Sequence, residues 1–269
     1  MDRLEEKARW VRQQVLEMIA RVGKGHIGGS FSCVEILVSL YYGGILRLDP
    51  EIPSWGERDR FILSKGHACA SLYAVLADLG FFTVSELATF NQEGSRLEGH
   101  PNRGIPGIEV DTGSLGHGLG IGAGLALSAK INKADRMTIV LLSDGECHEG
   151  SVWEAAMFAT HHELHNLVAI VDRNQQCVLD FTENCNRLEP FAAKWRAFGW
   201  EIREVAGHSF EELLHALGDI RLRKTDPLII IANTIKGKGV SFMEGKIEWH
   251  HRVPEGEKLK MARQELASG

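Results

Sequence analysis

The chain has 269 residues, of which 44% are hydrophobic and 25% are charged, and its formal net charge is −6. This composition is typical of a globular protein, and the acidic balance without a basic arm argues against nucleic-acid binding. No apolar stretch reaches the roughly 18 residues of a membrane span, and the N-terminus lacks a secretory apolar segment. The cysteines are odd in number and form no Cys-x-x-Cys pair, so we expect a reduced, cytoplasmic protein without membrane contact.

Helical and strand patterns alternate along most of the chain. In chain order they predict a helix over 3–22, a strand over 60–63, helices over 68–79 and 116–131, a strand over 137–142, a helix over 150–162, a strand over 167–172, a helix over 188–198, a strand over 201–205, a helix over 209–217, a strand over 228–233 and a helical tail after Pro254. Ser32 and Glu35 form a capping-box pattern, and residues 90–112 predict a long loop. The alternation predicts a single α/β domain over 1–269, with a parallel sheet flanked by helices on both faces.

An acid and an amide follow two of the predicted strands. Asp144 comes directly after the apolar run 137–143, and Asn174 follows the apolar run 166–171. Parallel strands end at one edge of a sheet, where ligands bind. Gly145 permits a sharp turn and can offer a backbone N–H to an anion near a helix N-terminus. Because Mg²⁺ takes oxygen ligands and is commonly shared with a phosphate group, we predict a magnesium–diphosphate site at this edge.

Further motifs occur in the order found in transketolases. They are Gly25-His26-Ile27-Gly28-Gly29-Ser30, Leu63-Ser64-Lys65-Gly66-His67, Gly99-His100-Pro101, Thr112-Gly113-Ser114-Leu115-Gly116 and the segment 234–239. The Asp-Gly pair followed 30 residues later by Asn resembles the thiamine diphosphate signature. From about residue 5 to 255 the chain therefore resembles the N-terminal half of a transketolase, which implies the diphosphate-binding (PP-type) domain of thiamine diphosphate enzymes.

The resemblance implies ligands for the cofactor and its metal ion. For the metal they are Asp144, Asn174 and the backbone carbonyl of Gln176, with Mg²⁺ as the expected ion and Ca²⁺ or Mn²⁺ as substitutes. For thiamine diphosphate they are His67, Gly113, Ser114, Leu115, Gly145, Asn174 and His250. The loop at 113–115 would support the bent cofactor, in which the amino group of the pyrimidine lies against the reactive carbon. The cofactor supplies the carbanion chemistry, and the protein supplies the geometry.

The resemblance also implies catalytic residues. His26, His100 and His250 match histidines of the substrate channel, which bind hydroxyl groups and move protons near neutral pH. His251 could take the place of His250. Glu149 and Glu154 match glutamates that connect two active sites across a dimer interface, where burial and mutual repulsion would raise their pKa values.

Three residues depart from the family pattern. His117 stands where Gln is common, and its effect is open. Ser143 replaces the first Gly of Gly-Asp-Gly, which is tolerable if its φ is negative. Gln175 follows Asn174, where Gly or an apolar residue is usual.

A complete enzyme of this family also needs a pyrimidine-binding domain, which supplies a glutamate to the cofactor and basic residues to the substrate phosphate. The motifs occupy nearly all of the 269 residues and leave no segment for it, so we expect a complementary C-terminal subunit, two copies of each chain (an α2β2 heterotetramer), and no activity for this chain alone. The implied reaction transfers a two-carbon ketol unit from a ketose phosphate to an aldose, as in the pentose phosphate pathway of carbohydrate metabolism. The alternatives are a split enzyme resembling 1-deoxyxylulose-5-phosphate synthase, a transferase for a modified or sulfonated sugar, and a non-catalytic binding module.

Overall fold

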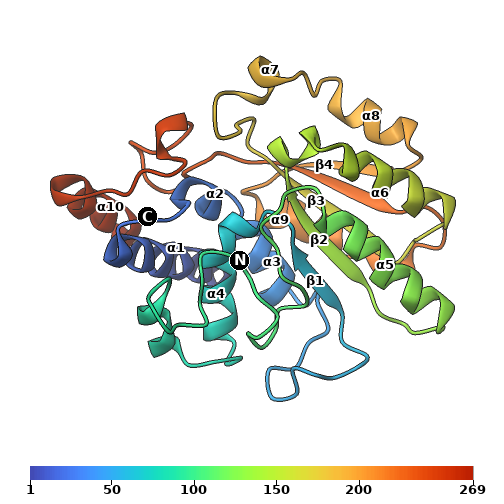
Figure 1. The fold of residues 1–269 in the computed structure, drawn as a ribbon, viewed down its shortest axis with the longest axis horizontal. Helices are drawn as coiled ribbons and strands as arrows, with labels where there is room; N and C mark the ends of the chain where they lie inside the picture. The colour runs from blue at the N-terminus through green and yellow to red at the C-terminus, as the bar shows by residue number, and fades with distance from the viewer. Residues whose placement is uncertain (269) are drawn as a thin grey trace.

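The computed structural model describes residues 1–268 and shows a parallel five-stranded sheet between two layers of helices (Figure 1). The strands are β1 (Arg60–Leu63), β2 (Thr138–Ser143), β3 (Leu167–Arg173), β4 (Glu201–Ala206) and β5 (Leu228–Asn233). Their order across the sheet is β1-β2-β3-β5-β4, and every neighbouring pair is parallel. This confirms the predicted fold class.

The described residues form ten α-helices. They are α1 (Asp2–Val22), α2 (Ile27–Ser32), α3 (Val34–Tyr42), α4 (Cys69–Asp78), α5 (Gly118–Ile131), α6 (Gly150–His161), α7 (Thr182–Cys185), α8 (Phe191–Ala197), α9 (Phe210–Leu217) and α10 (Gly256–Ser268). The short helices α2 and α7 were not predicted, because six and four residues are too few for a periodic pattern. Among residues 1–268 no helix is long and apolar enough to cross a lipid bilayer.

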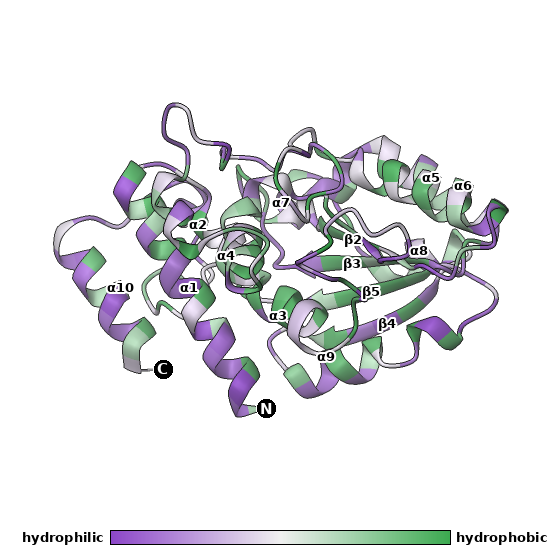
Figure 2. Ribbon diagram, turned by 90° about the horizontal axis from the view of Figure 1, so that it is seen from below, coloured by the Kyte–Doolittle hydropathy of each residue, from purple (hydrophilic) through white to green (hydrophobic). Residues whose placement is uncertain are grey.

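The two faces of the sheet bury separate cores, because successive side chains of a strand point to opposite faces. In β2, Ile139 and Leu141 pack into the core shared with α1 to α4 and α9. Val140 and Leu142 pack into the core shared with α5, α6 and α8. In Figure 1, α5 and α6 lie side by side over one face, and α10 lies beside α1 at the far end. Figure 2 shows more hydrophilic residues on edge strand β4 than on the central strands, as expected for a blunted sheet edge.

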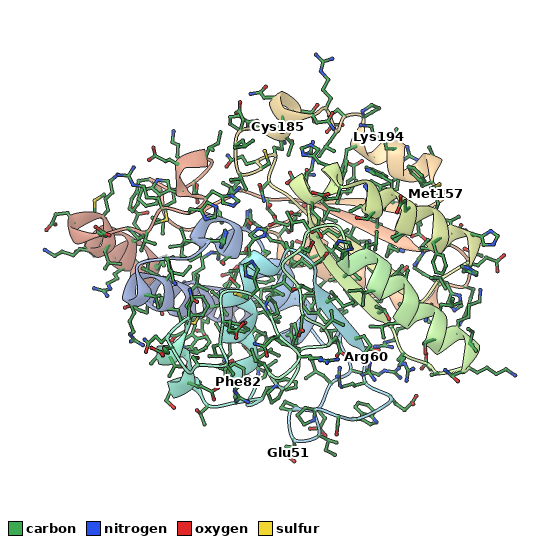
Figure 3. All side chains as sticks on the ribbon, in the orientation of Figure 1. Glu51, Arg60, Phe82, Met157, Cys185 and Lys194 are labelled. Carbon is green, nitrogen blue, oxygen red and sulfur yellow. The ribbon has the colours of Figure 1, made fainter. Side chains whose placement is uncertain are left out.

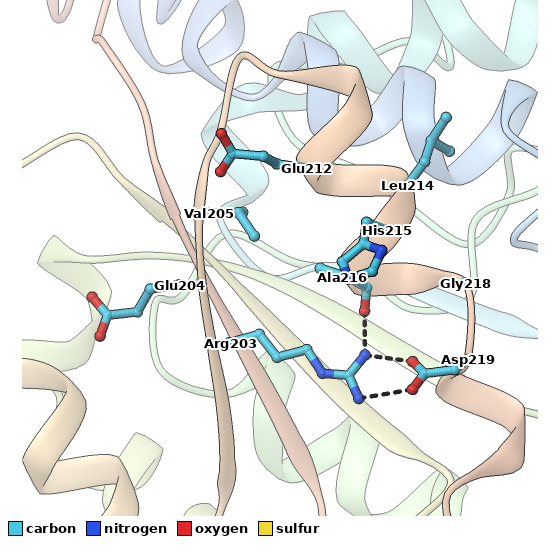
Figure 4. Close-up of a pocket in the computed structure, with 9 residues that line it drawn as sticks. All are labelled: Arg203, Glu204, Val205, Glu212, Leu214, His215, Ala216, Gly218 and Asp219. Atoms are coloured by element: carbon cyan, nitrogen blue, oxygen red, sulfur yellow. Dashed lines mark hydrogen bonds and ion pairs between the residues drawn. The ribbon is translucent and has the colours of Figure 1, made fainter.

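A hollow lies beside the edge strand β4, between the strand and α9 (Figure 4). Arg203 crosses it, forms an ion pair with Asp219 and donates a hydrogen bond to the carbonyl of Ala216. None of the predicted site residues lines this hollow. The guanidinium of Arg203 already has partners there. The predicted site residues lie instead at the carboxyl edge of the sheet.

Candidate active site

The predicted site residues come together at the carboxyl edge of the sheet. The loops that follow β1, β2, β3 and β5 begin at Ser64, Asp144, Asn174 and Thr234. Because these strands are parallel, all four loops start at the same edge. The sequence prediction that Asp144 and Asn174 share an edge is thus satisfied by the register that pairs Ser143 with Asp172.

A buried ion pair holds the middle of this edge together. Lys65 Nζ donates to Asp172 Oδ2 and, at 2.8 Å, to the carbonyl of Gly29 in α2. Ser32 Oγ donates to the same carboxylate at 2.6 Å, and Thr234 Oγ1 donates to its other oxygen. Three segments that are distant in sequence therefore meet on the carboxylate of Asp172 in β3.

The pKa values of this pair reflect its burial. Burial by itself would raise the pKa of Asp172, but the charge of Lys65 and the hydrogen bonds from Lys65, Ser32 and Thr234 lower it below its ordinary value. Burial likewise opposes the charged form of Lys65, and Asp172 outweighs it and raises the Lys65 pKa. Both groups are therefore charged at neutral pH, and each depends on the other.

The predicted metal ligands occupy two adjacent loops. Asp144 is fully buried, and its Oδ1 accepts the N–H of Gly145 at 2.8 Å. Its Oδ2 accepts the N–H of Gln175 and lies 3.2 Å from the guanidinium of Arg173. Burial and the nearby carboxylate of Asp172 raise the pKa of Asp144 to about 6, and a divalent cation at this position would favour the ionised form.

The loop after β3 presents the other two oxygens. Asn174 and Gln176 are both buried, and Asn174 Oδ1 accepts the N–H of Gln176 at 3.2 Å. Between them Gln175 has a φ of 62°, in the left-handed region that favours glycine. In this turn the N–H of Gln175 donates to Asp144 Oδ2.

Ser143 requires no such freedom. It is not among the described non-glycine residues with positive φ, and its Oγ accepts the N–H of Glu146 at 3.3 Å. A serine in place of the first glycine is therefore accommodated without strain.

A second buried lysine faces the metal loop. Lys236 is 2% exposed, and its Nζ lies 3.4 Å from the carbonyl oxygens of Gln176 and Cys177. Within residues 1–268 no carboxylate lies at ion-pair distance from it. Burial, reinforced by the charge of Lys65, lowers its pKa to about 8. A buried cation without a counter-ion is a place where an anion binds favourably.

Histidines from four separate segments cluster beside these loops. His26 precedes α2, and its ring centroid lies 5.3 Å from that of His67, 6.2 Å from His100, 5.5 Å from His250 and 4.3 Å from His251. A cavity of ≈ 460 Å³ is lined by four of these rings, those of His26, His67, His100 and His251. The ligand nitrogens of His26, His250 and His251 lie within 4.8 Å of one another, but imidazoles suit transition metals rather than Mg²⁺.

Three of the clustered imidazoles, those of His26, His67 and His250, are neutral at neutral pH. Burial, with repulsion from His251 and His100, lowers the pKa of His26 to about 4. Burial and the charge of Lys236 lower the pKa of His250 to about 2, and burial also depresses the pKa of His67. A neutral imidazole can both donate and accept a hydrogen bond, which suits sugar hydroxyl groups.

The sequence and fold of the chain match those of known proteins. The sequence matches the family described as "Transketolase, thiamine diphosphate binding domain" over residues 4–268. The chain belongs to the transketolase family. It is 42% identical to an apulose-4-phosphate transketolase subunit of Phocaeicola vulgatus, over 99% of this chain and 95% of that protein. It is 41% identical to a 6-deoxy-6-sulfo-D-fructose transketolase subunit of a Clostridium species, over 98% of this chain and 96% of that protein.

Full-length transketolases match over part of their length. Human transketolase is 40% identical over 92% of this chain and 39% of its own length. The crystal structure of transketolase from Campylobacter jejuni superimposes with a TM-score of 0.93 at 31% identity, covering 99% of this chain and 43% of that one. The chain thus spans about two-fifths of the full-length transketolases and nearly all of the subunits. The resemblance inferred from the motifs and the thiamine diphosphate-binding fold are confirmed.

The remaining predicted residues of this transketolase chain lie on loops around the site. Gly113 packs against His100, because a Cβ on Gly113 would lie 3.2 Å from that ring. Ser114 is exposed and Leu115 is half-buried in the same loop. Glu149 and Glu154 are exposed at the start of α6, and His117 is exposed at the start of α5.

Sequence reasoning missed several residues that the structure places at the centre. Glu146 is fully buried and accepts hydrogen bonds from Ser64, from the N–H of Gly116 at 2.8 Å and from the N–H of Ser143 at 3.2 Å. Glu146 therefore joins the loop after β1, the loop that contains Leu115 and Gly116, and the end of β2. Lys65 and Lys236 lay inside motifs that were recognised, but both motifs contain other polar residues, so nothing in the sequence signalled that these lysines are buried.

The predicted capping box at Ser32 is wrong. Cys33, not Ser32, precedes α3, and Ser32 binds Asp172 instead. Glu35 accepts two hydrogen bonds from Arg12, both at 2.7 Å, and a third from His208 at 2.8 Å. Tertiary partners therefore replaced the local hydrogen bonds that the spacing predicted.

Proposed function

We propose that this chain is the thiamine diphosphate-binding subunit of a two-subunit transketolase, which transfers a two-carbon ketol unit from a ketose phosphate to an aldose. The observation that carries the proposal is the pairing of an oxygen-ligand loop with a buried cation. Asp144, Asn174 and Gln176 offer oxygens, and Lys236 Nζ lies beside them, 3.4 Å from the Gln176 carbonyl, without a counter-ion among the described residues. This arrangement suits a divalent metal ion bound to a diphosphate.

The donor set fits Mg²⁺ better than a transition metal. Carboxylate, amide and peptide oxygens are hard ligands, and two or three of them from the protein are typical of a Mg²⁺ ion that is also bound by phosphate. Ca²⁺ and Mn²⁺ use the same oxygen ligands and can substitute. Gly145 would allow the backbone to lie close to the diphosphate, and His67 and His250, which are near Lys236, would contact the same anion.

When bound, thiamine diphosphate supplies the carbanion chemistry of ketol transfer. The chain's own residues hold and orient the reactants. Gly113, Ser114 and Leu115 support the pyrimidine ring. His26 and His100 bind the hydroxyl groups of the donor and carry protons at those oxygens, because their cavity is large enough for a sugar and His26 is neutral.

The sequence left open whether His250 or His251 serves the site, and in this proposal each of them has a separate role. His250 is 7% exposed and stands 5.8 Å from His67, which suits contact with the cofactor. His251 is exposed and lines the histidine cavity, which suits contact with the sugar.

A complementary C-terminal subunit completes the site in this proposal. It supplies the pyrimidine-binding domain, and the assembly contains two copies of each chain. Support comes from the relatives of matching length, whose names describe them as subunits of a transketolase. Glu149 and Glu154 are exposed here and available to an interface, where they would connect the two active sites. A location in the cytoplasm remains a prediction from the cysteine pattern.

The donor sugar is a ketose phosphate or a sulfonated ketose. One relative is named for apulose 4-phosphate and another for 6-deoxy-6-sulfo-D-fructose, so subunits of this length serve both kinds of anion. The sulfonated-sugar alternative is therefore retained as the second candidate. A synthase-like enzyme acting on a ketoacid is less well supported, since the four histidines of the cavity suit a polyhydroxylated donor.

The test is calorimetry of Mg²⁺ and thiamine diphosphate binding to this chain together with its partner subunit. Asp144→Ala and Asn174→Ala should abolish measurable cofactor binding, whereas Asp219→Ala, at the hollow beside β4, should leave it unchanged. A rate assay should detect ketol transfer only when both subunits are present. Unchanged cofactor affinity in both site variants, or full activity of this chain alone, would refute the proposal.

A further inference from the structure

Two cysteines lie in contact beside the metal loop and have no role in the proposed reaction. The sulfur atoms of Cys177 and Cys185 are 3.0 Å apart, and neither forms a disulfide. Cys185 is exposed and Cys177 is half-buried. The other three cysteines of the chain, Cys33, Cys69 and Cys147, are buried.

The backbone holds the two thiols in this position. Residues 176 and 181 form an antiparallel bridge, and the N–H of Cys177 donates to the carbonyl of Asp180 at 3.0 Å. The N–H of Cys185, the last residue of α7, donates to the carbonyl of Phe181 at 3.2 Å. Figure 3 labels Cys185 at the outer rim of the molecule, on α7. The pair is thus prearranged by local hydrogen bonds and open to solvent.

We propose that Cys177 and Cys185 form a reversible disulfide that weakens the binding of the metal and its diphosphate. The oxidant is a low-molecular-weight disulfide such as oxidised glutathione. The Cys185 thiolate attacks one of its sulfurs and releases one small thiolate. Cys177 then attacks the mixed disulfide at the Cys185 sulfur and releases the second. Two protein thiols are oxidised, one small disulfide is reduced to two thiols, and the two protons pass to the released thiolates.

The link to the metal site is direct along the chain. Cys177 follows Gln176, whose carbonyl is a proposed metal ligand, and its own carbonyl lies 3.4 Å from Lys236 Nζ. It also packs on Gly145, because a Cβ there would lie 3.2 Å from the Cβ of Cys177. A movement of Cys177 therefore reaches both loops that carry metal ligands.

Closing the disulfide requires such a movement. A bonded pair of sulfurs is about 2.05 Å apart, so the present pair must approach by about 1 Å. Metal–ligand distances tolerate only about 0.2 Å. Part of the approach is absorbed by side-chain rotation, and the rest displaces the carbonyl of Gln176. This step rests on the proposed function, whereas the formation of the disulfide does not.

The expected effect is roughly a tenfold loss of affinity, as is typical when a group supporting a metal ligand is disturbed. Binding linkage is reciprocal, so Mg²⁺ with thiamine diphosphate should disfavour the disulfide by the same factor. For this two-electron couple a tenfold factor corresponds to about 30 mV. The disulfide should therefore be easier to reduce when both ligands are bound, with a reduction potential higher by about that amount.

The first experiment maps thiols on the full chain after equilibration with reduced and oxidised glutathione, using non-reducing peptide mass spectrometry. A linked peptide pair containing Cys177 and Cys185 is expected, while Cys33, Cys69 and Cys147 stay reduced as internal controls. Cys185→Ser should leave only a glutathione adduct on Cys177, or none. If the wild-type chain gives no linked pair under oxidised glutathione, the disulfide site is wrong.

The second experiment compares cofactor binding by the reduced and the oxidised chain, with the partner subunit present. Roughly tenfold weaker binding after oxidation, absent in Cys185→Ser, is expected. Equal affinity in the two redox states would overturn the effect on the metal site. Absence of binding in the reduced state would instead count against the proposed function, so the two failures are distinguishable.

Discussion

Two walls of the site differ in how they are held. The braced wall consists of residues 26–32 and 64–67, and the open loop consists of residues 174–186. In the braced wall, Lys65 and Ser32 bind the buried Asp172, and Arg12 donates to the carbonyl of Phe31.

The open loop exposes apolar side chains instead. Leu179 is 83% exposed, Val178 52% and Phe181 44%. It also contains the strained turn at Gln175. The braced wall is thus held by hydrogen bonds within the chain. The open loop instead has exposed apolar side chains and a strained backbone turn, both of which a ligand or a partner can contact. Four predictions test this contrast, from the largest expected effect to the smallest.

The first prediction removes the central ion pair of the braced wall. Lys65→Met leaves Asp172 buried without its partner, so the free energy of unfolding should fall by about 3–5 kcal/mol. Urea denaturation at neutral pH measures it. Adding Asp172→Leu should restore most of the loss, and Lys260→Met, which breaks an exposed ion pair with Glu257, should change stability by less than about 1 kcal/mol. An equally small effect of Lys65→Met would show that the wall is not braced by this pair.

The second prediction concerns the pH dependence of stability that arises from Glu35, the partner of Arg12 behind the braced wall. Although burial opposes ionisation, Arg12 and His208 lower the pKa of Glu35 to about 2, compared with 4.5 for an unperturbed glutamate. The ionised Glu35 therefore makes its full contribution to the free energy of unfolding above about pH 4.5, and this contribution is lost as the pH falls toward 2. It amounts to about 3 kcal/mol at most.

Glu35→Gln removes this titration. Denaturation curves recorded between pH 2 and 5 should show a smaller pH dependence of stability in the variant than in the wild type. Parallel pH profiles of the two proteins would contradict the role of Glu35.

The third prediction addresses the exposed apolar surface of the open loop. Leu179→Ser should change the free energy of unfolding by less than about 0.5 kcal/mol, because the side chain is exposed. Affinity for the partner subunit should fall by about 1.5–3 kcal/mol if docking buries this leucine. Leu222→Ser is the matched control, since Leu222 is 76% exposed near the opposite edge of the sheet. Equal partner affinity of the two variants, measured by titration calorimetry, would place the interface elsewhere.

The fourth prediction relieves the strain in the open loop. Gln175→Gly allows the positive φ freely, but it also increases the entropy of the unfolded chain. The net change in stability should therefore stay within about 1 kcal/mol, with cofactor binding retained. Gln175→Val should destabilise by more, because a β-branched residue resists this conformation. Thermal unfolding of both variants measures the two changes in stability. A smaller loss of stability in Gln175→Val than in Gln175→Gly would contradict the assigned turn.

Much of the fold could be predicted because its signals are local. The apolar runs before Asp144 and Asn174 are long enough to mark buried strands, and their strand–helix alternation implies a parallel sheet. Boundaries shifted by a few residues, as when the helix predicted from 188 began at Phe191. The helices α2 and α7 were missed because they are shorter than the repeat that reveals a helix.

The sequence by itself determined the family, the α/β class and the motif residues, because each of these depends on residue types at fixed spacing along the chain. Only the tertiary structure decided which side chains meet. It joined Lys65 to Asp172 across 107 residues and hydrogen-bonded Glu146 to both Ser64 and Gly116. It also made Glu35, which the spacing predicted to cap a helix, the partner of Arg12. Such pairings follow from the packing of distant segments against one another, and the spacing of residues along the chain does not show which distant segments will meet.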